Sequence, residues 1–139
     1  MQQSIKRGID FILALVGLIL ASPVLLIVAI LVRMKLGSPI FFRQARVGLN
    51  GEIFEMIKFR TMKDAYDANG QPLPDSERLT SFGQFLRKTS LDELPELINV
   101  LKGDMSLVGP RPPIPREVIQ YNKYQYQRLL VKPGITCYW

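Results

Sequence analysis

The longest apolar stretch of the chain runs from residue 11 to residue 32 and contains no charged side chain. At about 1.5 Å per helical residue, such a run is long enough to cross a hydrocarbon core of ~30 Å. Ser22 and Pro23 interrupt it near the middle, where a proline removes one N–H and bends a helix. Basic residues flank both ends: Lys6, Arg7, Arg33 and Lys35.

Positive charge on both flanks favours both ends of this helix on the cytoplasmic side. The pattern therefore predicts a re-entrant membrane helix over residues 1–35 that enters one leaflet and returns at the Ser-Pro break. A kinked spanning helix is an alternative, because prolines occur in spanning helices. A cleaved signal peptide fits less well, because the apolar run continues past its only small-residue site at residues 21–22.

Two β-prone runs follow, separated by an Asn-Gly pair at residues 50–51 that is typical of a hairpin turn. We therefore expect two short antiparallel strands. The first begins with the apolar residues 40–42 and carries Arg43 and Arg46 on the same arm, and the second covers residues 53–62. Lys58 and Arg60 would share one face of the second strand, because side chains alternate along a strand. Two cations on one face suit a pyrophosphate, whereas solvated surface charge is the alternative.

Three further segments have apolar residues at helical spacing: 80–88, 90–102 and 116–130. Ser90 followed by Glu93 is a capping box that predicts the start of the second helix, and Gly103 predicts its end. The third segment mixes tyrosines with cations, a composition suited to the headgroup level of a membrane or to stacking on bases. The polar residues 64–76, with their prolines and Asn-Gly pair, predict an exposed loop.

Together these patterns predict an α/β (α+β) chain, a small membrane-associated domain. It would combine an N-terminal re-entrant helical hairpin, a short β-hairpin and amphipathic interfacial helices. Residues 36–139 would form one domain on the cytoplasmic face, since 139 residues allow one domain at most beside the membrane element.

The composition of the chain limits its ligands and the side chains that could act in catalysis. The 18 basic and 12 acidic residues give a net charge of +6, which suits a nucleic acid, an anionic bilayer or a phosphorylated substrate. The chain has no histidine and one cysteine, Cys137. Any acid, base or nucleophile must therefore be a carboxylate, a hydroxyl, an amine or that thiol.

Residues 87–112 hold the densest pattern of charge. Arg87 precedes the adjacent carboxylates Asp92 and Glu93, and a rigid Gly-Pro-Arg-Pro segment carries Arg111. Unpaired N–H groups at a helix start keep a carboxylate ionised and attract phosphate, so one carboxylate could face a ligand while the other caps. The alternative is that Glu93 only closes the capping box and Asp92 only favours the helix start.

Five short words of the sequence occur in a recognisable order. They are residues 58–62 (KFRTM), 89–95 (TSLDELP), 99–106 (NVLKGDMS), 108–112 (VGPRP) and 132–136 (KPGIT). In this order the chain resembles the bacterial sugar transferases, monotopic phosphoglycosyl transferases whose membrane helix carries a Ser-Pro break. In that family the last word is followed by more domain, so we expect this chain to be shortened at its C-terminus.

The resemblance implies transfer of a sugar-1-phosphate from a UDP-sugar to undecaprenyl phosphate, with release of UMP, at the cytoplasmic face of the bacterial inner membrane. It implies Asp92 as nucleophile and as a contact for Mg²⁺, and Glu93 as the group that orients the acceptor phosphate or assists proton movement. The basic residues implied to hold phosphate oxygens are Lys58, Arg60, Arg87 and Arg111. Membrane phospholipid would be a further partner, nucleic acid would not, and synthesis of a capsule, exopolysaccharide, lipopolysaccharide or glycoprotein would begin with this step.

A non-catalytic, membrane-anchored basic module that binds anionic lipid or RNA is the alternative function. It accounts for the charge and the apolar helix, but not for adjacent carboxylates within a cationic segment. A third possibility is an inactive fragment of an enzyme.

Overall fold

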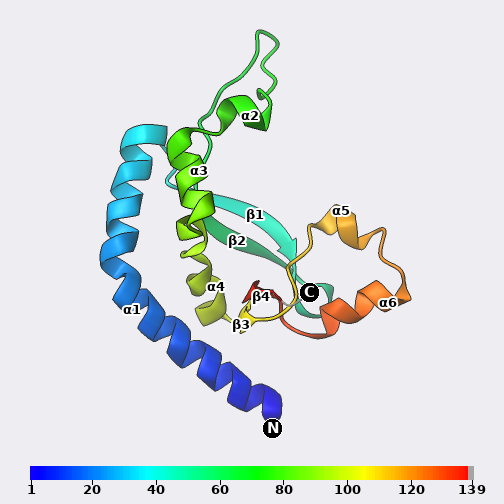
Figure 1. Cartoon of the computed structure of the whole chain (residues 1–139). Coiled ribbons are helices and arrows are strands. Elements are labelled where there is room, and N and C mark those ends of the chain that lie inside the picture. The colour runs from blue at the N-terminus through cyan, green and yellow to red at the C-terminus, as the bar shows by residue number, and fades with distance from the viewer. Residues whose placement is uncertain (138–139) are drawn as a thin grey trace. The chain divides into compact units, whose positions relative to one another are not determined.

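The computed structural model describes residues 1–137 and combines helices with two small sheets (Figure 1). The mixed α/β class is therefore confirmed. The chain divides into two compact units: the first comprises Met1–Leu20, Arg43–Ile57 and Glu96–Trp139, and the second Ala21–Phe42 and Lys58–Pro95. The expected domain boundary at residue 35 stays a prediction.

Helices and strands follow one another in this order: α1 (Gln2–Leu36), β1 (Phe41–Val47), η1 (Leu49–Gly51), β2 (Ile53–Phe59), α2 (Asp75–Arg78), α3 (Ser81–Lys88), η2 (Leu91–Glu93), α4 (Glu96–Lys102), β3 (Ser106–Val108), α5 (Pro115–Val118), α6 (Lys123–Tyr126), η3 (Gln127–Leu130) and β4 (Gly134–Thr136).

The N-terminal apolar pattern forms one helix, α1, with Pro23 inside it. Within the described chain, α1 is the helix that is long and apolar enough to cross a membrane. Many of its apolar side chains lack protein cover, among them Leu20 at 75% and Leu26 at 63% exposure. Because such a surface is unfavourable in water, α1 indicates membrane association, while the re-entrant path stays a prediction.

Each half of α1 contributes to the core of a different unit. In the first unit, Ala14 packs with Phe54 and Met56 of β2, Val100 of α4, and Met105. In the second unit, three side chains of α1 pack with the end of β2 and with α3; the core there is Val28, Val32, Leu36, Phe59 and Leu86. The helix is therefore held by protein contacts on both sides of Pro23.

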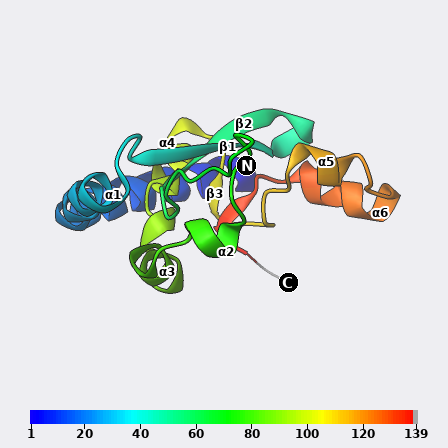
Figure 2. The same ribbon diagram turned by 90° about the horizontal axis from the view of Figure 1, so that it is seen from above.

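The expected hairpin is confirmed, because β1 and β2 pair around the Asn-Gly turn (Figures 1 and 2). Asn50 and Gly51 have φ of 56° and 82°, the left-handed conformation that asparagine and glycine tolerate best. The first strand, Phe41–Val47, includes Arg43 and Arg46, as expected for the first arm, and the second strand ends at Phe59, short of the expected residue 62.

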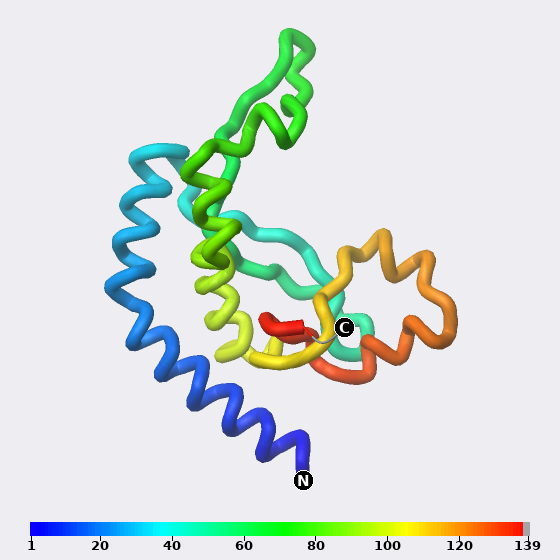
Figure 3. Tube along the Cα trace, in the orientation of Figure 1, coloured from blue at the N-terminus to red at the C-terminus, as the bar shows by residue number. Residues whose placement is uncertain are grey.

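A second sheet was not predicted. Strand β3 pairs in parallel with β4, so that Ser106 lies opposite Gly134 and Val108 opposite Thr136. In the trace of Figure 3, the yellow segment that holds β3 passes beside the red segment that holds β4. The two backbones approach very closely, since a Cβ on Gly134 would lie 2.1 Å from the Gly109 nitrogen. Only glycine fits there, and three-residue strands are too short for periodicity to reveal them.

The third expected helix, over residues 116–130, is wrong as one continuous element. The chain forms α5, α6 and η3 instead, and α6 begins at Asn122, whose side chain accepts from the Gln125 N–H at 2.9 Å. The Gln125 side chain accepts in turn from the Asn122 N–H at 3.0 Å. This capping box restarts the helix and so interrupts the run that the apolar spacing suggested.

Candidate active site

The segment that carries the two carboxylates is a turn rather than the first turn of an α-helix. Ser90 has φ of 58° and no capping hydrogen bond from its side chain, and residues 91–93 form the 3-10 turn η2. Ser90 follows the last turn of α3 and occupies the left-handed position that commonly ends a helix. The predicted capping box is therefore wrong, and α4 begins only after Pro95, which cannot donate a helical hydrogen bond.

Apolar anchors hold this turn on both sides. Leu86 of α3 is fully buried in the core of the second unit, and Leu91 packs against the same core. The Thr89 hydroxyl donates to the Phe85 carbonyl at 2.8 Å and so closes the end of α3. The backbone of the carboxylate pair is thereby fixed by packing rather than by a helix start.

Asp92 is a buried carboxyl, 7% exposed, in a cationic setting. Burial raises the pKa of this carboxyl above its ordinary value, and the neighbouring charge of Glu93 acts in the same direction. Lys58 and Arg87 oppose this pKa shift by favouring the ionised form. The second unit therefore brings together four of the predicted site residues: Asp92, Glu93, Lys58 and Arg87.

Lys58 and Glu93 form an ion pair, with Lys58 Nζ 3.0 Å from Glu93 Oε1. The pair is partly exposed, with side-chain exposures of 23% and 38%, so its own contribution to stability is small. Its importance is positional, because it holds a cation and a second carboxylate beside Asp92.

Arg60 is directed differently from Lys58. Strand β2 ends at Phe59, and the Arg60 guanidinium donates to the backbone carbonyl of Ser38 at 2.7 Å and to that of Pro39 at 3.3 Å. Arg60 is 7% exposed and also lies 3.3 Å from Asp64. The expected convergence of Lys58 and Arg60 on one ligand is not seen, and a phosphate contact by Arg60 stays a prediction.

Arg87 is exposed at the end of α3, and its Nε donates to the Thr61 hydroxyl at 3.0 Å. Thr61 itself is buried. Sequence reasoning missed this contact, although Thr61 lies in the word KFRTM and Arg87 just before TSLDELP.

Arg111 belongs to the first unit, where hydrogen bonds fix the loop that carries it. The Gly134 N–H donates to the Pro110 carbonyl at 2.9 Å, and the Val47 N–H to the Pro113 carbonyl at 2.9 Å. Arg46 Nη1 donates to the Pro112 carbonyl, also at 2.9 Å. Burial, together with the charge of Arg111, lowers the pKa of Arg46. The expected ordering of this proline-rich loop thus comes from strand pairing and a second arginine as well as from its prolines.

The Arg111 side chain is exposed, and within residues 1–137 it makes no hydrogen bond or ion pair. A cation on an ordered backbone with free donors suits an anionic ligand, because little entropy is lost on binding.

Two buried polar clusters of the first unit also escaped prediction. Asp10 Oδ2 accepts from Ser106 Oγ at 2.7 Å and from Lys6 Nζ at 3.1 Å, which ties α1 to β3. The spacing of Lys6 and Asp10 by four residues was an available signal. Fully buried Asn99 donates to the Glu55 carbonyl at 2.7 Å and accepts from the Ile57 N–H at 3.1 Å, so it pairs α4 with the edge of β2.

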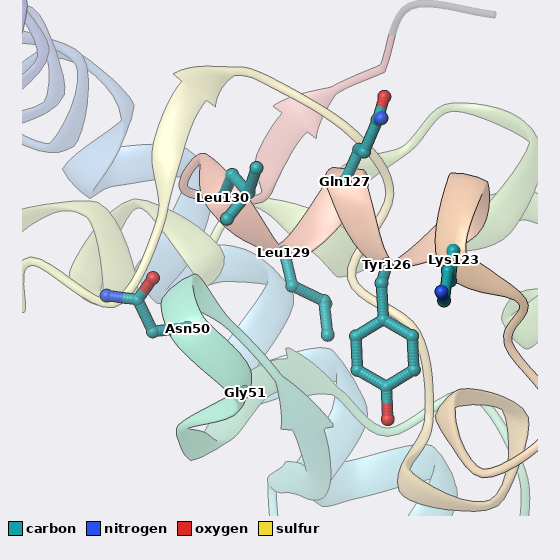
Figure 4. Close-up of a pocket in the computed structure, with 7 residues that line it drawn as sticks. All are labelled: Asn50, Gly51, Lys123, Tyr126, Gln127, Leu129 and Leu130. Atoms are coloured by element: carbon teal, nitrogen blue, oxygen red, sulfur yellow. The ribbon is translucent and has the colours of Figure 1, made fainter.

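A cavity of about 400 Å³ lies in the first unit between η1 and the segment formed by α6 and η3 (Figure 4). Its walls include Asn50 and Gly51 on one side, and Tyr126 and Leu129 on the other. None of the predicted site residues lines it. The site is therefore defined by the charged cluster of the second unit and not by this cavity.

Sequence comparison identifies the class of protein that carries this carboxylate pair. The profile of the family described as "Bacterial sugar transferase" matches residues 1–139, and the chain belongs to this family. Its membership confirms the resemblance seen in the five words.

Three relatives are particularly similar. The chain is 50% identical over 132 residues to the "Uncharacterized sugar transferase EpsL" of Bacillus subtilis (strain 168), covering 95% of this chain and 65% of the relative. It is 46% identical over 147 residues to the "Galactosyl transferase CpsE" of Streptococcus agalactiae serotype III (strain NEM316), covering 96% and 32%. It is 46% identical over 134 residues to the "UDP-glucose:undecaprenyl-phosphate glucose-1-phosphate transferase" of Xanthomonas campestris pv. campestris, covering 91% and 28%. The chain thus spans from about a quarter to two thirds of the length of these relatives.

Proposed function

We propose that this chain carries the catalytic site of a phosphoglycosyl transferase that moves a sugar-1-phosphate from a UDP-sugar to undecaprenyl phosphate and releases UMP. Family membership supports the reaction class. The printed name of the Xanthomonas relative supplies the donor and acceptor classes. The observation that carries the proposal is the buried carboxyl of Asp92 beside Lys58, Glu93 and Arg87.

In the first step, a carboxylate oxygen of Asp92 attacks the phosphorus nearest the sugar. A P–O bond forms to Asp92, the diphosphate P–O bond breaks, and its electron pair leaves on UMP. In the second step, an oxygen of undecaprenyl phosphate attacks the same phosphorus. The bond from phosphorus to Asp92 then breaks, which restores the carboxylate and yields the polyprenyl diphosphate sugar.

In the first step, the Asp92 carboxylate must approach the negatively charged diphosphate of the donor. Neighbouring basic residues would reduce the repulsion between these two anions. Lys58 and Arg87 lie close enough to Asp92 to favour its ionised form, and they would also reduce repulsion from the diphosphate. Burial of Asp92 limits competition by water, which would otherwise cleave the acyl phosphate. Glu93, beside Lys58, would orient the acceptor phosphate or assist proton movement.

Magnesium fits the residues present. In the described chain no group of three or more His, Cys, Asp or Glu side chains could hold a metal by itself. Mg²⁺ is commonly bound by one or two carboxylates together with substrate phosphates. Asp92 would supply the protein oxygens, and the bound ion would screen the charge of the diphosphate.

The apolar helix α1 would hold the catalytic site at the membrane surface. A water-soluble donor and a lipid acceptor meet only at the interface, so the site must lie at headgroup level. Basic residues on both flanks of the apolar run support a re-entrant path, because they favour both ends of α1 on the cytoplasmic side. The catalytic residues would lie on the cytoplasmic side, since nucleotide sugars are cytoplasmic.

The experiment measures UMP release from UDP-glucose and UDP-galactose, with undecaprenyl phosphate and Mg²⁺ in detergent. We expect acceptor-dependent UMP that Asp92→Asn lowers by at least ~10³-fold and that a chelator abolishes, because the nucleophile or the charge screening is lost. Asp75→Asn changes an exposed carboxylate of α2 and should leave the rate within about twofold. The covalent intermediate allows at most one equivalent of UMP per enzyme without acceptor. UMP release that survives Asp92→Asn, or repeated turnover without acceptor, would contradict the proposal.

A further inference from the structure

The side chain of Arg87 is held at one end only. Its Nε donates to the Thr61 hydroxyl at 3.0 Å. In the described part of the chain, no hydrogen bond or ion pair occupies its Nη1 and Nη2 atoms. Arg87 is exposed while Thr61 is 7% exposed, so the bonded Nε of an exposed side chain lies against a buried hydroxyl.

This arrangement depends on a close crossing of two backbones. A Cβ on Gly83 would lie 1.9 Å from the carbonyl oxygen of Thr61, so α3 contacts residue 61 where only a glycine fits. Arg87 lies four residues after Gly83, and residues at that spacing share one face of a helix. The crossing therefore brings Arg87 over the Thr61 side chain.

The contact with Thr61 determines which edge of the Arg87 guanidinium is left for a ligand. A guanidinium offers its N–H groups in a rigid planar fork, so fixing one nitrogen fixes the direction of the others. With Nε bound to Thr61, the edge formed by Nη1 and Nη2 is the one left for a ligand, and it matches two oxygens of one phosphate. The charge of this guanidinium already acts on Asp92, so that phosphate would lie near the nucleophile.

We propose that Thr61 is a positioning residue that fixes Arg87 for two-pronged binding of a phosphate of the nucleoside diphosphate donor. This inference rests on the proposed function, because the donor is the diphosphate in question. Thr61 touches neither the donor nor the reacting atoms; it acts through Arg87.

The test compares Thr61→Val, which keeps the shape and removes the hydroxyl, with Thr61→Ser, which keeps the hydroxyl. Two quantities are measured: the equilibrium dissociation constant for UDP, and the KM and kcat for UMP release. We expect Thr61→Val to raise the Kd and the KM about tenfold, with kcat changed less than threefold and unfolding temperature held. Thr61→Ser should lie within about threefold of the unchanged chain.

A double-mutant cycle separates positioning from a general structural role. In an Arg87→Ala background, Thr61→Val should produce no further loss of UDP affinity, because its partner is already absent. Arg87→Lys keeps the charge but lacks the guanidinium fork, so it should lose affinity with Thr61 intact, which tests the pair even if Thr61→Val unfolds.

The outcomes of these measurements distinguish the positioning role of Thr61 from the proposed transferase function. UDP binding that Thr61→Val weakens only when Arg87 is present supports the positioning role, whether or not UMP is released. UDP binding without any acceptor-dependent UMP release refutes the proposed function alone. Equal losses from Thr61→Val with and without Arg87, no loss at all, or no UDP binding by the unchanged chain, would overturn the inference.

Discussion

At the scale of single residues, the Asp92 carboxyl must be ionised for catalysis although it is buried. Catalysis needs its carboxyl ionised, whereas burial raises its pKa and so favours the neutral acid. Lys58 and Arg87 reduce this cost without removing it. The site is therefore less stable at neutral pH than the same fold with a neutral side chain would be.

Asp92→Asn should raise the unfolding temperature at neutral pH while abolishing transfer. A carboxyl with a raised folded-state pKa contributes stability below its unfolded pKa and loses it as the pH rises through the folded value. The stability gap between variant and wild type should therefore be small in acid and grow as the pH rises from the unfolded-state pKa to the raised folded-state pKa of Asp92. Thermal unfolding in detergent across this range measures it.

The matched control is Asp75→Asn, which alters an exposed carboxylate in α2 and should shift unfolding little at any pH. An Asp92→Asn variant that is less stable than wild type at neutral pH would show that Asp92 stabilises the fold through its charge. That result would contradict the dominance of burial over the neighbouring cations.

At the level of elements, the small parallel sheet decides where Arg111 lies. Strands β3 and β4 are three residues long, yet their crossing at Gly109 and Gly134 orders the loop that carries this cation. The hydrogen bond from the Gly134 N–H to the Pro110 carbonyl belongs to that crossing. The segments 108–112 (VGPRP) and 132–136 (KPGIT) therefore contact each other directly.

Gly134→Ala should destabilise the first unit by roughly 3 kcal/mol, because its Cβ would lie 2.1 Å from the Gly109 nitrogen and the backbones must separate. Gly8→Ala is the control within the same unit. No atom lies within 4 Å of its Cβ position, and alanine favours a helix by about 1 kcal/mol. Chemical denaturation in detergent compares the two variants, and equal stabilities would refute the close crossing.

At the scale of the whole molecule, the path of α1 determines how the chain meets its lipid substrate. The helix is apolar through its middle, basic at both ends and interrupted by Pro23. If both ends lie on the cytoplasmic side, the residues on either side of the apolar run are accessible from that side alone.

Single cysteines at Gln3 and Lys35, in a Cys137→Ala background, test this topology. An impermeant maleimide should label both positions in inverted vesicles and neither in right-side-out cells. The background without cysteine controls for unspecific labelling. Labelling of the two positions from opposite sides would establish a spanning helix and contradict the re-entrant path.

The sequence by itself determined the features that depend on local chemistry or on the order of words. The apolar run of α1, the Asn-Gly hairpin and the glycine that ends α4 follow from residues close in the chain. The family follows from the order of five short words along the chain. Turn residues and apolar spacing act over one or two turns of backbone, so they can be recognised without knowing the fold.

Tertiary structure alone decided which distant residues meet. Ser90 ends α3 and does not cap the next helix, because packing of Leu86 and Leu91 into one core sets the direction of the turn. The glycines at 83 and 134 admit close backbone crossings that no periodicity reports. The crossing at Gly83 brings Thr61 into contact with Arg87, and the crossing at Gly134 fixes the loop that carries Arg111. Contacts between distant segments depend on the packing of the whole unit and not on local preference, so the sequence alone does not predict them.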